Sequence, residues 1–161
     1  MESIFEEQLE IREWRNDDEV RKYMFNPQII SLESHISWLN SLRENKKIKI
    51  FYIILNNEKI GINSLRKRSN FGYEWGIYLN NKVPRGKGIG KQAGKEFIKY
   101  VFEILKANFL EYEVLEKNKA SIKLALSLGL TPYKEELKEI ENNIEKVIYL
   151  KINKSEWRKN E

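Results

Sequence analysis

The stretch Arg85-Gly86-Lys87-Gly88-Ile89-Gly90 sets the architecture of the chain, because it joins a predicted strand at 71–79 to the longest amphipathic helix. Glycines at such a junction let backbone N–H groups approach an anion closely, and the positive end of the helix dipole favours negative charge there. The turn lacks the Gly-Lys-Ser/Thr sequence that a Walker loop has at this spacing, and Lys91 stands where a dinucleotide fingerprint needs glycine. The sequence therefore predicts a phosphate-binding turn of neither of these nucleotide classes.

Regular elements are predicted on both sides of this turn. Before it, residues 48–55, 60–65 and 71–79 predict three antiparallel strands, with a bulge at Gly76 in the third. After it, we expect a helix whose apolar face consists of Ala93, Phe97, Ile98, Val101, Ile104 and Leu105. Further helices are expected at 7–14, from a capping box at 16–19 through Met24, from Ser31 through Leu42 and at 118–128, and strands at 109–115, 133–140 and 144–152. This order predicts an α/β (α+β) three-layer fold, with a mixed, mostly antiparallel sheet flanked by helices.

The composition bounds the fold class and the chemistry. At 161 residues, of which 41% are hydrophobic and 33% charged, we expect one domain over 1–161. The chain has no cysteine and one histidine, which excludes thiolate nucleophiles and Cys-based zinc sites and predicts that no metal is bound. No apolar run has the length of a signal peptide or a membrane span, so we expect a cytoplasmic protein without a membrane partner. The net charge of +5 favours anionic ligands in general.

The turn also fits the pattern Arg/Gln-x-x-Gly-x-Gly/Ala and resembles the pyrophosphate loop of the GNAT superfamily of N-acetyltransferases. Nearly the whole chain follows the order of elements of that superfamily. The resemblance implies the three-layer acetyltransferase fold, N-acetyltransferase activity and acetyl-CoA as co-substrate. It further implies coenzyme contacts at Ile77, Leu79, Arg85, Gly86, Lys87, Gly88, Ile89, Gly90, Asn118 and Ser121. The alternative is a helix start that needs glycine only to turn.

A second segment, Asn118-Lys119-Ala120-Ser121 with Gly129-Leu130, resembles the family's Asn-x-x-Ala/Ser...Gly-Phe segment, with leucine in place of phenylalanine. Many members have a tyrosine seven residues after the asparagine, whose hydroxyl is proposed to protonate the departing thiolate. Here that residue is Ala125, so the usual general acid is missing. The Asn-x-Ala-Ser form looks like the branch that acetylates ribosomal-protein amino termini, which nominates Ser121 for the role. A Ser121 that only caps its helix is the alternative, and Tyr78 is another candidate acid.

Acetyl transfer to an amine needs a neutral nitrogen, a route for its proton and donors for the developing oxyanion. Glu74 lies on the predicted strand before the glycine turn, where family members often place a carboxylate that takes the amine proton directly or through water. The resemblance also implies an oxyanion donor in a backbone N–H near Ile77 or Tyr78, at the expected bulge. An ordinary solvated carboxylate is the alternative reading of Glu74.

The acceptor is suggested by Trp14-Arg15-Asn16 and by residues 20–25 and 30–39, which resemble the nucleotide-sugar N-acetyltransferases of pseudaminic acid biosynthesis. The resemblance implies a small-molecule acceptor, the 4-amino group of a UDP-linked 4-amino-4,6-dideoxy-N-acetyl-hexose. It places Met24 and Phe25 in an apolar pocket for the deoxysugar and His35 in register with that family's helix. Arg15 is a candidate for the UDP phosphates. The alternative reading puts Met24, Phe25 and His35 in the core.

Three other functions stay open at this point. Within enzymes, the segment from Asn118 to Ser121 supports a ribosomal-protein N-terminal or other small-amine acetyltransferase. The missing tyrosine at position 125 fits a non-catalytic acyl-CoA binder. A nucleic-acid-binding module is favoured only weakly by the basic cluster at 66–68, because no aromatic residues are interleaved with it. We expect no nucleic-acid partner, and either a monomer or a homodimer.

Overall fold

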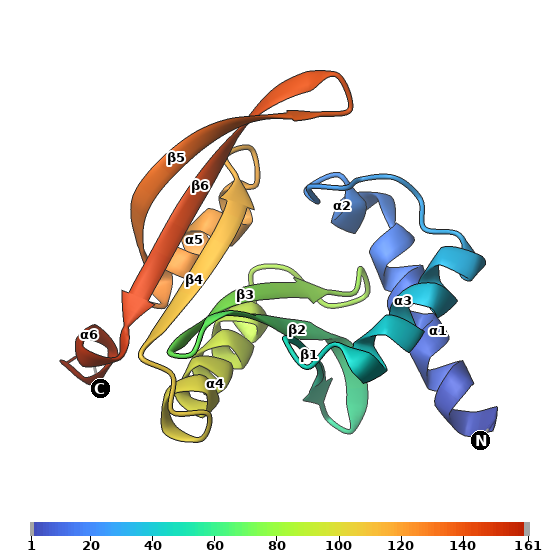
Figure 1. The fold of residues 1–161 in the computed structure, drawn as a ribbon, viewed down its shortest axis with the longest axis horizontal. Helices are drawn as coiled ribbons and strands as arrows, with labels where there is room; N and C mark the ends of the chain where they lie inside the picture. Colours follow the sequence, from blue (N-terminus) through green and yellow to red (C-terminus); the bar gives the residue numbers. More distant parts are fainter. Residues whose placement is uncertain (1, 160–161) are drawn as a thin grey trace.

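The computed structural model describes residues 2–159, with the side chains of residues 9–159. Six strands form one sheet in the order β1-β2-β3-β4-β6-β5, with helices on both sides (Figure 1). At β1 (Ile48–Leu55), the ring of Tyr52 lies 6.3 Å from that of Trp14 in α1 (Glu2–Asn16), and the ring of Phe51 lies 5.3 Å from that of Phe97 in α4 (Ile89–Glu103). Because neighbouring strand residues point to opposite faces, the sheet has an α1 face and an α4 face. The expected three-layer α+β fold with a mixed sheet is confirmed.

The first three strands form an antiparallel meander, as their alternating apolar residues predict. β1 turns into β2 (Glu58–Ser69) through Asn56 and Asn57, which both have the positive φ that a tight hairpin turn requires. β2 pairs in turn with β3 (Gly72–Leu79). All three strands begin and end within a few residues of the expected positions, since the turn residues between them are unambiguous.

The strand β3 has no bulge at Gly76, where we expected one, and the bulge between β2 and β3 lies at a different residue. Gly76 faces Ser64 in register, and a Cβ added to it would lie only 2.7 Å from the Ser64 hydroxyl oxygen. Glycine therefore serves close packing at this position and does not mark an extra residue. The register between β2 and β3 shifts instead between Lys67 and Ser69, which makes Arg68 the bulged residue.

The third and fourth strands run parallel and separate after a short stretch of pairing. β4 (Phe109–Leu115) pairs with β3 only as far as Trp75, which lies opposite Tyr112. On its other side, β4 stays paired along its whole length with β6 (Asn143–Asn153). The sheet is therefore split between β3 and β4 beyond the pair of Trp75 and Tyr112.

The end of β3 presents free backbone groups to this split. The N–H of Asn80 donates to the carbonyl of Ile60 at 2.8 Å, so alternate residues before Asn80 direct their N–H and C=O groups toward β2. The residues between them, Ile77 and Leu79, direct theirs toward the side that β4 has left. No strand among residues 2–159 pairs with them there.

The α4 face carries the main hydrophobic core. α4 and α5 (Lys119–Ser127) cover it, with Phe97, Ile98 and Val101 buried as predicted. Ile104 does not belong to the buried face: it follows the last helical residue and is 65% exposed, whereas Phe102 is fully buried in its place. A short helix that we did not expect, α6 (Lys154–Lys159), packs Trp157 against Phe102 with ring centroids 5.3 Å apart.

Three helices precede the sheet, and their caps differ slightly from the prediction. The N-cap of α2 (Asp18–Arg21) is Asp17, whose side chain accepts from the N–H of Glu19, and not Asn16. Asn16 instead exchanges two hydrogen bonds with the backbone of Ile30, at 2.7 and 2.9 Å. Ser31 caps α3 (Leu32–Glu44) as expected. Helix α1 also starts earlier than predicted, at Glu2.

The last two strands form a long hairpin at the far edge of the sheet. β5 (Thr131–Ile140) joins β6 through Glu141 and Asn142, which both have positive φ, at the predicted turn. β5 is exposed along most of its length. The tip of the hairpin extends toward the loop that follows α2 (Figure 1). This loop and the hairpin bound the open part of the α1 face.

Candidate active site

The glycine turn has the conformation and the free space that an anion site needs. Gly86 and Gly88 have φ values of +73° and +76°, and a Cβ added at either would meet no atom within 4 Å. Gly88 is the N-cap of α4 and contributes no side chain to the N–H groups that a first helical turn leaves free. Arg85 and Lys87 are exposed beside them. The turn thus combines free N–H donors, the positive end of α4 and two cations.

The open edge of β3 meets this turn. A Cβ on Gly90 would lie 3.7 Å from the side chain of Leu79 and 3.9 Å from that of Leu124 in α5. The first turn of α4, the end of β3 and the body of α5 therefore converge at the split in the sheet. The residues expected to contact the coenzyme come from these same elements: Ile77, Leu79, Arg85, Gly86, Lys87, Gly88, Ile89, Gly90, Asn118 and Ser121.

The start of α5 is capped by Asn118, whose side-chain oxygen accepts from the N–H of Ser121 at 3.2 Å. Ser121 is therefore not the cap of its helix. Ala125 is fully buried and offers no hydroxyl of its own.

Glu74 lies in a cluster of three carboxylates around one guanidinium on the α1 face. Arg68 forms an ion pair with Glu74 at 2.9 Å and another with Glu111 at 3.7 Å, and it also contacts Glu113. These side chains are only partly exposed, the carboxylates less so than Arg68. Trp75 points to the opposite face, where it is 2% exposed, as the strand alternation predicts.

The surroundings of Glu74 favour its neutral form. Burial is the main cause that raises the pKa of Glu74, and the negative charge of Glu113 raises it further. The positive charges of Arg68 and Arg66 act in the opposite direction and lower the pKa of Glu74. A carboxylate with a raised pKa in a hollow is a candidate for proton transfer, and Glu74 is therefore not an ordinary solvated carboxylate.

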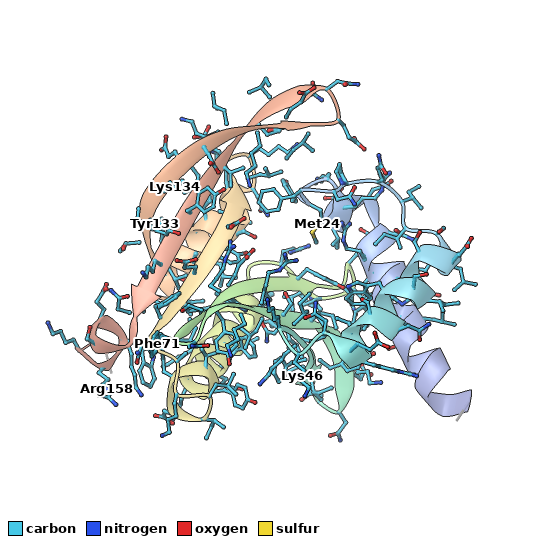
Figure 2. The ribbon with its side chains drawn as sticks, viewed as in Figure 1. Met24, Lys46, Phe71, Tyr133, Lys134 and Arg158 are labelled. Atoms are coloured by element: carbon cyan, nitrogen blue, oxygen red, sulfur yellow. The ribbon has the colours of Figure 1, made fainter. Side chains whose placement is uncertain are left out.

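A cavity of about 430 Å³ lies over this cluster. One wall is the sheet, with Arg66, Glu74 and Glu113, and the opposite wall is Phe25 in the loop after α2. The tip of the β5–β6 hairpin closes it, and the ammonium of Lys138 lies 5.6 Å from the centroid of the Phe25 ring. Met24 lies on the inner side of the same loop (Figure 2). The cavity is lined by Phe25, Arg66, Arg68, Glu74, Glu113, Lys138, Glu139 and Ile140.

Arginine side chains hold the loop that carries Phe25. Arg12 donates to the carbonyl of Ile30, Arg21 to that of Pro27, and Arg15 to that of Asn26 at 2.6 Å. The Nη1 atom of Arg15 is buried and has no hydrogen-bond partner, alone among the buried side-chain nitrogens and oxygens of residues 9–159. A buried guanidinium donor without a partner is costly, so this nitrogen is available for a ligand oxygen or a water.

Two further predicted site residues lie deeper in the structure. Tyr78 is on the α1 face of β3, where burial raises the pKa of its hydroxyl well above the usual range and the charge of Arg15 works in the opposite direction. His35 is 2% exposed on α3, and its ring lies 5.6 Å from that of Trp38. His35 lines neither the cavity over Glu74 nor the one between α4 and β1, of about 450 Å³. Phe25 is 39% exposed, so the core reading of this residue is wrong.

Among residues 9–159, no group of three His, Cys, Asp or Glu side chains is placed to hold a metal ion. No helix within the described part of the chain is both long and apolar enough to cross a membrane.

Known proteins share this arrangement. The family model described as "Acetyltransferase (GNAT) domain" matches residues 6–131. The acetyltransferase PseH of Campylobacter jejuni is 30% identical over 126 residues, which are 78% of each chain. The structure of Campylobacter jejuni N-acetyltransferase PseH in complex with acetyl coenzyme A is 25% identical, with a TM-score of 0.70 and coverage of 92% and 91% of the two chains. Spermidine N-acetyltransferase from Vibrio cholerae, in complex with CoA and spermine, is 18% identical with a TM-score of 0.83 over 94% and 92%, and thus shares the fold. The chain therefore belongs to the GNAT family of acetyltransferases.

Proposed function

We propose that this enzyme transfers the acetyl group of acetyl-CoA to the 4-amino group of a UDP-linked 4-amino-4,6-dideoxy-N-acetyl-hexose. The observation that carries the proposal is the cavity over Glu74, in which a proton acceptor and the apolar ring of Phe25 face each other. The 30% identity to the acetyltransferase PseH over 126 residues supports this assignment. The cavity volume of about 430 Å³ is in the range of a small-molecule site.

Acetyl-CoA is the co-substrate in this proposal, and the glycine turn fits its pyrophosphate. The free space above Gly86 and Gly88 leaves room for phosphate oxygens against the N–H groups of α4, with Arg85 and Lys87 as counter-ions. The exposed backbone groups of Ile77 and Leu79 would bind the pantetheine arm as a neighbouring strand would. Asn118 and Ser121 would border the arm from α5.

In the proposed reaction, β3 supplies both the base and the donor that stabilises the oxyanion. Glu74 takes the proton of the acceptor amine, and its raised pKa suits a base that must work near neutral pH. The N–H of Ile77, directed into the split, is placed to stabilise the oxyanion, and it is a better candidate than that of Tyr78, which the ladder directs toward β2. A bulge at Gly76 is not needed for this. Ser121 is the hydroxyl that we assign to the departing sulfur, and the half-buried Tyr78 is the weaker candidate.

The acceptor is recognised by contacts of two kinds. Phe25 and Met24 suit the 6-deoxy position, where a methyl group replaces a hydroxyl. Arg66 and Lys138, which line the same cavity, are the cations for the UDP phosphates. The Nη1 atom of Arg15 is buried and has no partner, and we assign it to a neutral oxygen of the sugar and not to the phosphates. We assign His35 an indirect role, because its ring packs against that of Trp38 in α3, the helix that supports this region.

An acceptor comparison tests the proposal. Free-thiol release from acetyl-CoA is measured with the UDP-4-amino sugar, with spermidine and with a basic peptide that mimics a ribosomal-protein amino terminus. The highest kcat/KM is expected for the UDP-4-amino sugar, and Phe25→Ala should raise KM for that acceptor alone. Preferential turnover of spermidine or the peptide would overturn the acceptor assignment, and coenzyme binding without turnover of any amine would identify a non-catalytic binder. We expect the enzyme to act in the cytoplasm, as a monomer or a homodimer.

A further inference from the structure

A hydrogen bond joins the loop that leads into the glycine turn to the start of helix α2. The side-chain Nδ2 of Asn81, in the loop after β3, donates to Oδ2 of Asp17 at 2.7 Å, although the two residues are 64 positions apart in the sequence. Asp17 uses its other oxygen, Oδ1, to cap α2 by accepting from the N–H of Glu19 at 2.9 Å. One carboxylate therefore both caps α2 and binds the loop before the glycine turn.

The backbone of this loop is anchored on both sides of Asn81. The N–H of Asn80 donates to the carbonyl of Ile60 at 2.8 Å, and the N–H of Val83 donates to the carbonyl of Asn80 at 3.3 Å. Val83 is 6% exposed and packs in an apolar cluster that includes Ile60. The amide of Asn81 is therefore presented to Asp17 from a backbone that other contacts hold in place.

Helix α2 is short, and its position depends on such contacts. It has four residues, of which Val20 is buried. A helix of this length does not form alone in water, so its cap and its packing decide where it lies. The carbonyl of Asp17 also accepts from the N–H of Arg21 at 2.9 Å, which makes Asp17 part of the first turn. The bond from Asn81 thus acts on the residue from which α2 starts.

The loop that carries Phe25 follows directly from α2 and is tied to it by Arg21. The N–H of Met24 donates to the carbonyl of Arg21 at 3.0 Å, and Nη1 of Arg21 donates to the carbonyl of Pro27 at 3.1 Å. These bonds lie on either side of Phe25, which forms a wall of the acceptor cavity. A series of hydrogen bonds thus leads from the loop after β3, through the cap of α2, to this wall.

We propose that Asn81 is a positioning residue, which holds Asp17 and thereby fixes the Phe25 loop relative to the turn that binds the acetyl donor. The inference rests on the proposed function, in which Phe25 contacts the acceptor. Acetyl transfer requires the amine and the thioester to be aligned, and a link between the two binding segments serves that alignment. Neither Asn81 nor Asp17 takes part in the bonds that form and break.

An exchange of the two side chains tests this link. Asn81→Asp alone sets two carboxylates against each other, whereas Asp17→Asn together with Asn81→Asp restores the bond with donor and acceptor reversed. Asparagine is as good an N-cap as aspartate, so α2 stays capped in the double variant. Amide hydrogen exchange over residues 18–27 should become about fivefold faster in Asn81→Asp, the factor for one lost hydrogen bond, and should return to the original rate in the double variant.

Steady-state kinetics test whether the link serves the acceptor. In Asn81→Asp, KM for the UDP-4-amino sugar should rise about fivefold. The Kd of acetyl-CoA, measured by calorimetry, should stay constant, because Asn80 and Val83 still anchor the loop. The double variant should recover the original KM. Asn153→Ala, which removes an amide-to-carboxylate bond of 2.6 Å to Glu156, is the matched control and should change neither constant.

The outcomes separate this inference from the proposed function. Unchanged exchange over residues 18–27 in Asn81→Asp, or faster exchange that the double variant does not reverse, would overturn the positioning role. Faster exchange with an unchanged acceptor KM would also overturn it. Preference for another amine would overturn only the acceptor assignment, since KM is then measured with that amine. If no amine is turned over, the proposed function fails, and the exchange rates alone decide whether Asn81 positions the loop.

Discussion

Glu74 takes its character from neighbours that lie far from it in the sequence. Arg68, at the bulge of β2, contacts Glu74 together with Glu111 and Glu113 from β4. The charge of Glu113 raises the pKa of Glu74, and that of Arg68 lowers it. The residue type and strand position of Glu74 could be predicted from the sequence, but its partners could not, because 45 residues separate Arg68 from Glu113.

This balance predicts a shift in pH dependence. Without the cation in Arg68→Gln, the charged form of Glu74 is less favoured, so its pKa rises further above the ordinary value. At each pH on the acid limb a smaller fraction of Glu74 is deprotonated, and the limb of kcat/KM should move to higher pH. Glu74→Gln should remove this limb and lower kcat by a factor on the order of 10² to 10⁴. Lys67→Gln, which removes a neighbouring charge outside the cluster, should leave the limb in place; an unmoved limb in Arg68→Gln would contradict the base assignment.

Arg15 offers a second test at a single side chain. Its Nη2 is bound to Asn26, and its buried Nη1 has no partner. Arg15→Lys keeps the charge and loses one of these two donors, so KM for the UDP-4-amino sugar should rise about tenfold while KM for acetyl-CoA stays constant. The exposed Arg43→Lys is the matched control, for which neither constant should change. Equal increases in both KM values would place Arg15 outside the acceptor site.

Among the elements, the glycine turn and the strands were the most predictable. Both depend on local requirements: glycine where φ is positive, and alternating apolar residues where one face is buried. The errors also have local causes. A glycine inside a strand fits close packing as well as a bulge, which misplaced the bulge at Gly76. Asn16 and Asp17 are equally good caps, which shifted the start of α2 by one residue.

The turn between β3 and α4 can be tested as a unit. Gly88→Ala places a methyl group in the open space above the turn and strains a backbone with φ of +76°. Stability should fall by about 1 kcal/mol, and KM for acetyl-CoA should rise about tenfold as a phosphate contact is lost. Gly129→Ala, at the C-terminal end of α5 with φ of +93°, carries the same backbone strain and should leave KM for acetyl-CoA unchanged. Equal KM effects in both variants, measured beside urea unfolding, would mean that strain alone is responsible.

At the scale of the whole molecule, stability depends on the contact between helix α6 and the central helix α4. Trp157 of α6 is 9% exposed and packs on the fully buried Phe102 of α4. Trp157→Ala should therefore lower the free energy of unfolding by about 3–5 kcal/mol in urea denaturation. Ile104→Ala removes a side chain that is 65% exposed, and it should change stability by less than about 0.5 kcal/mol. A larger effect of Ile104→Ala than of Trp157→Ala would place the edge of the core where the sequence pattern alone had put it.

The identity of the elements, their order and the anion-binding turn follow from the sequence, because each needs only a local pattern of residues. That pattern was sufficient to predict the family and the end of α4 at which the coenzyme is expected to bind. The site itself arises from contacts between distant segments. The split beyond Trp75 and Tyr112, the meeting of Arg68 with three carboxylates and the placement of Phe25 across from Glu74 all depend on strand pairing and loop packing. No short stretch of residues encodes such distances, which is why the partners of Glu74 could not be predicted from the sequence.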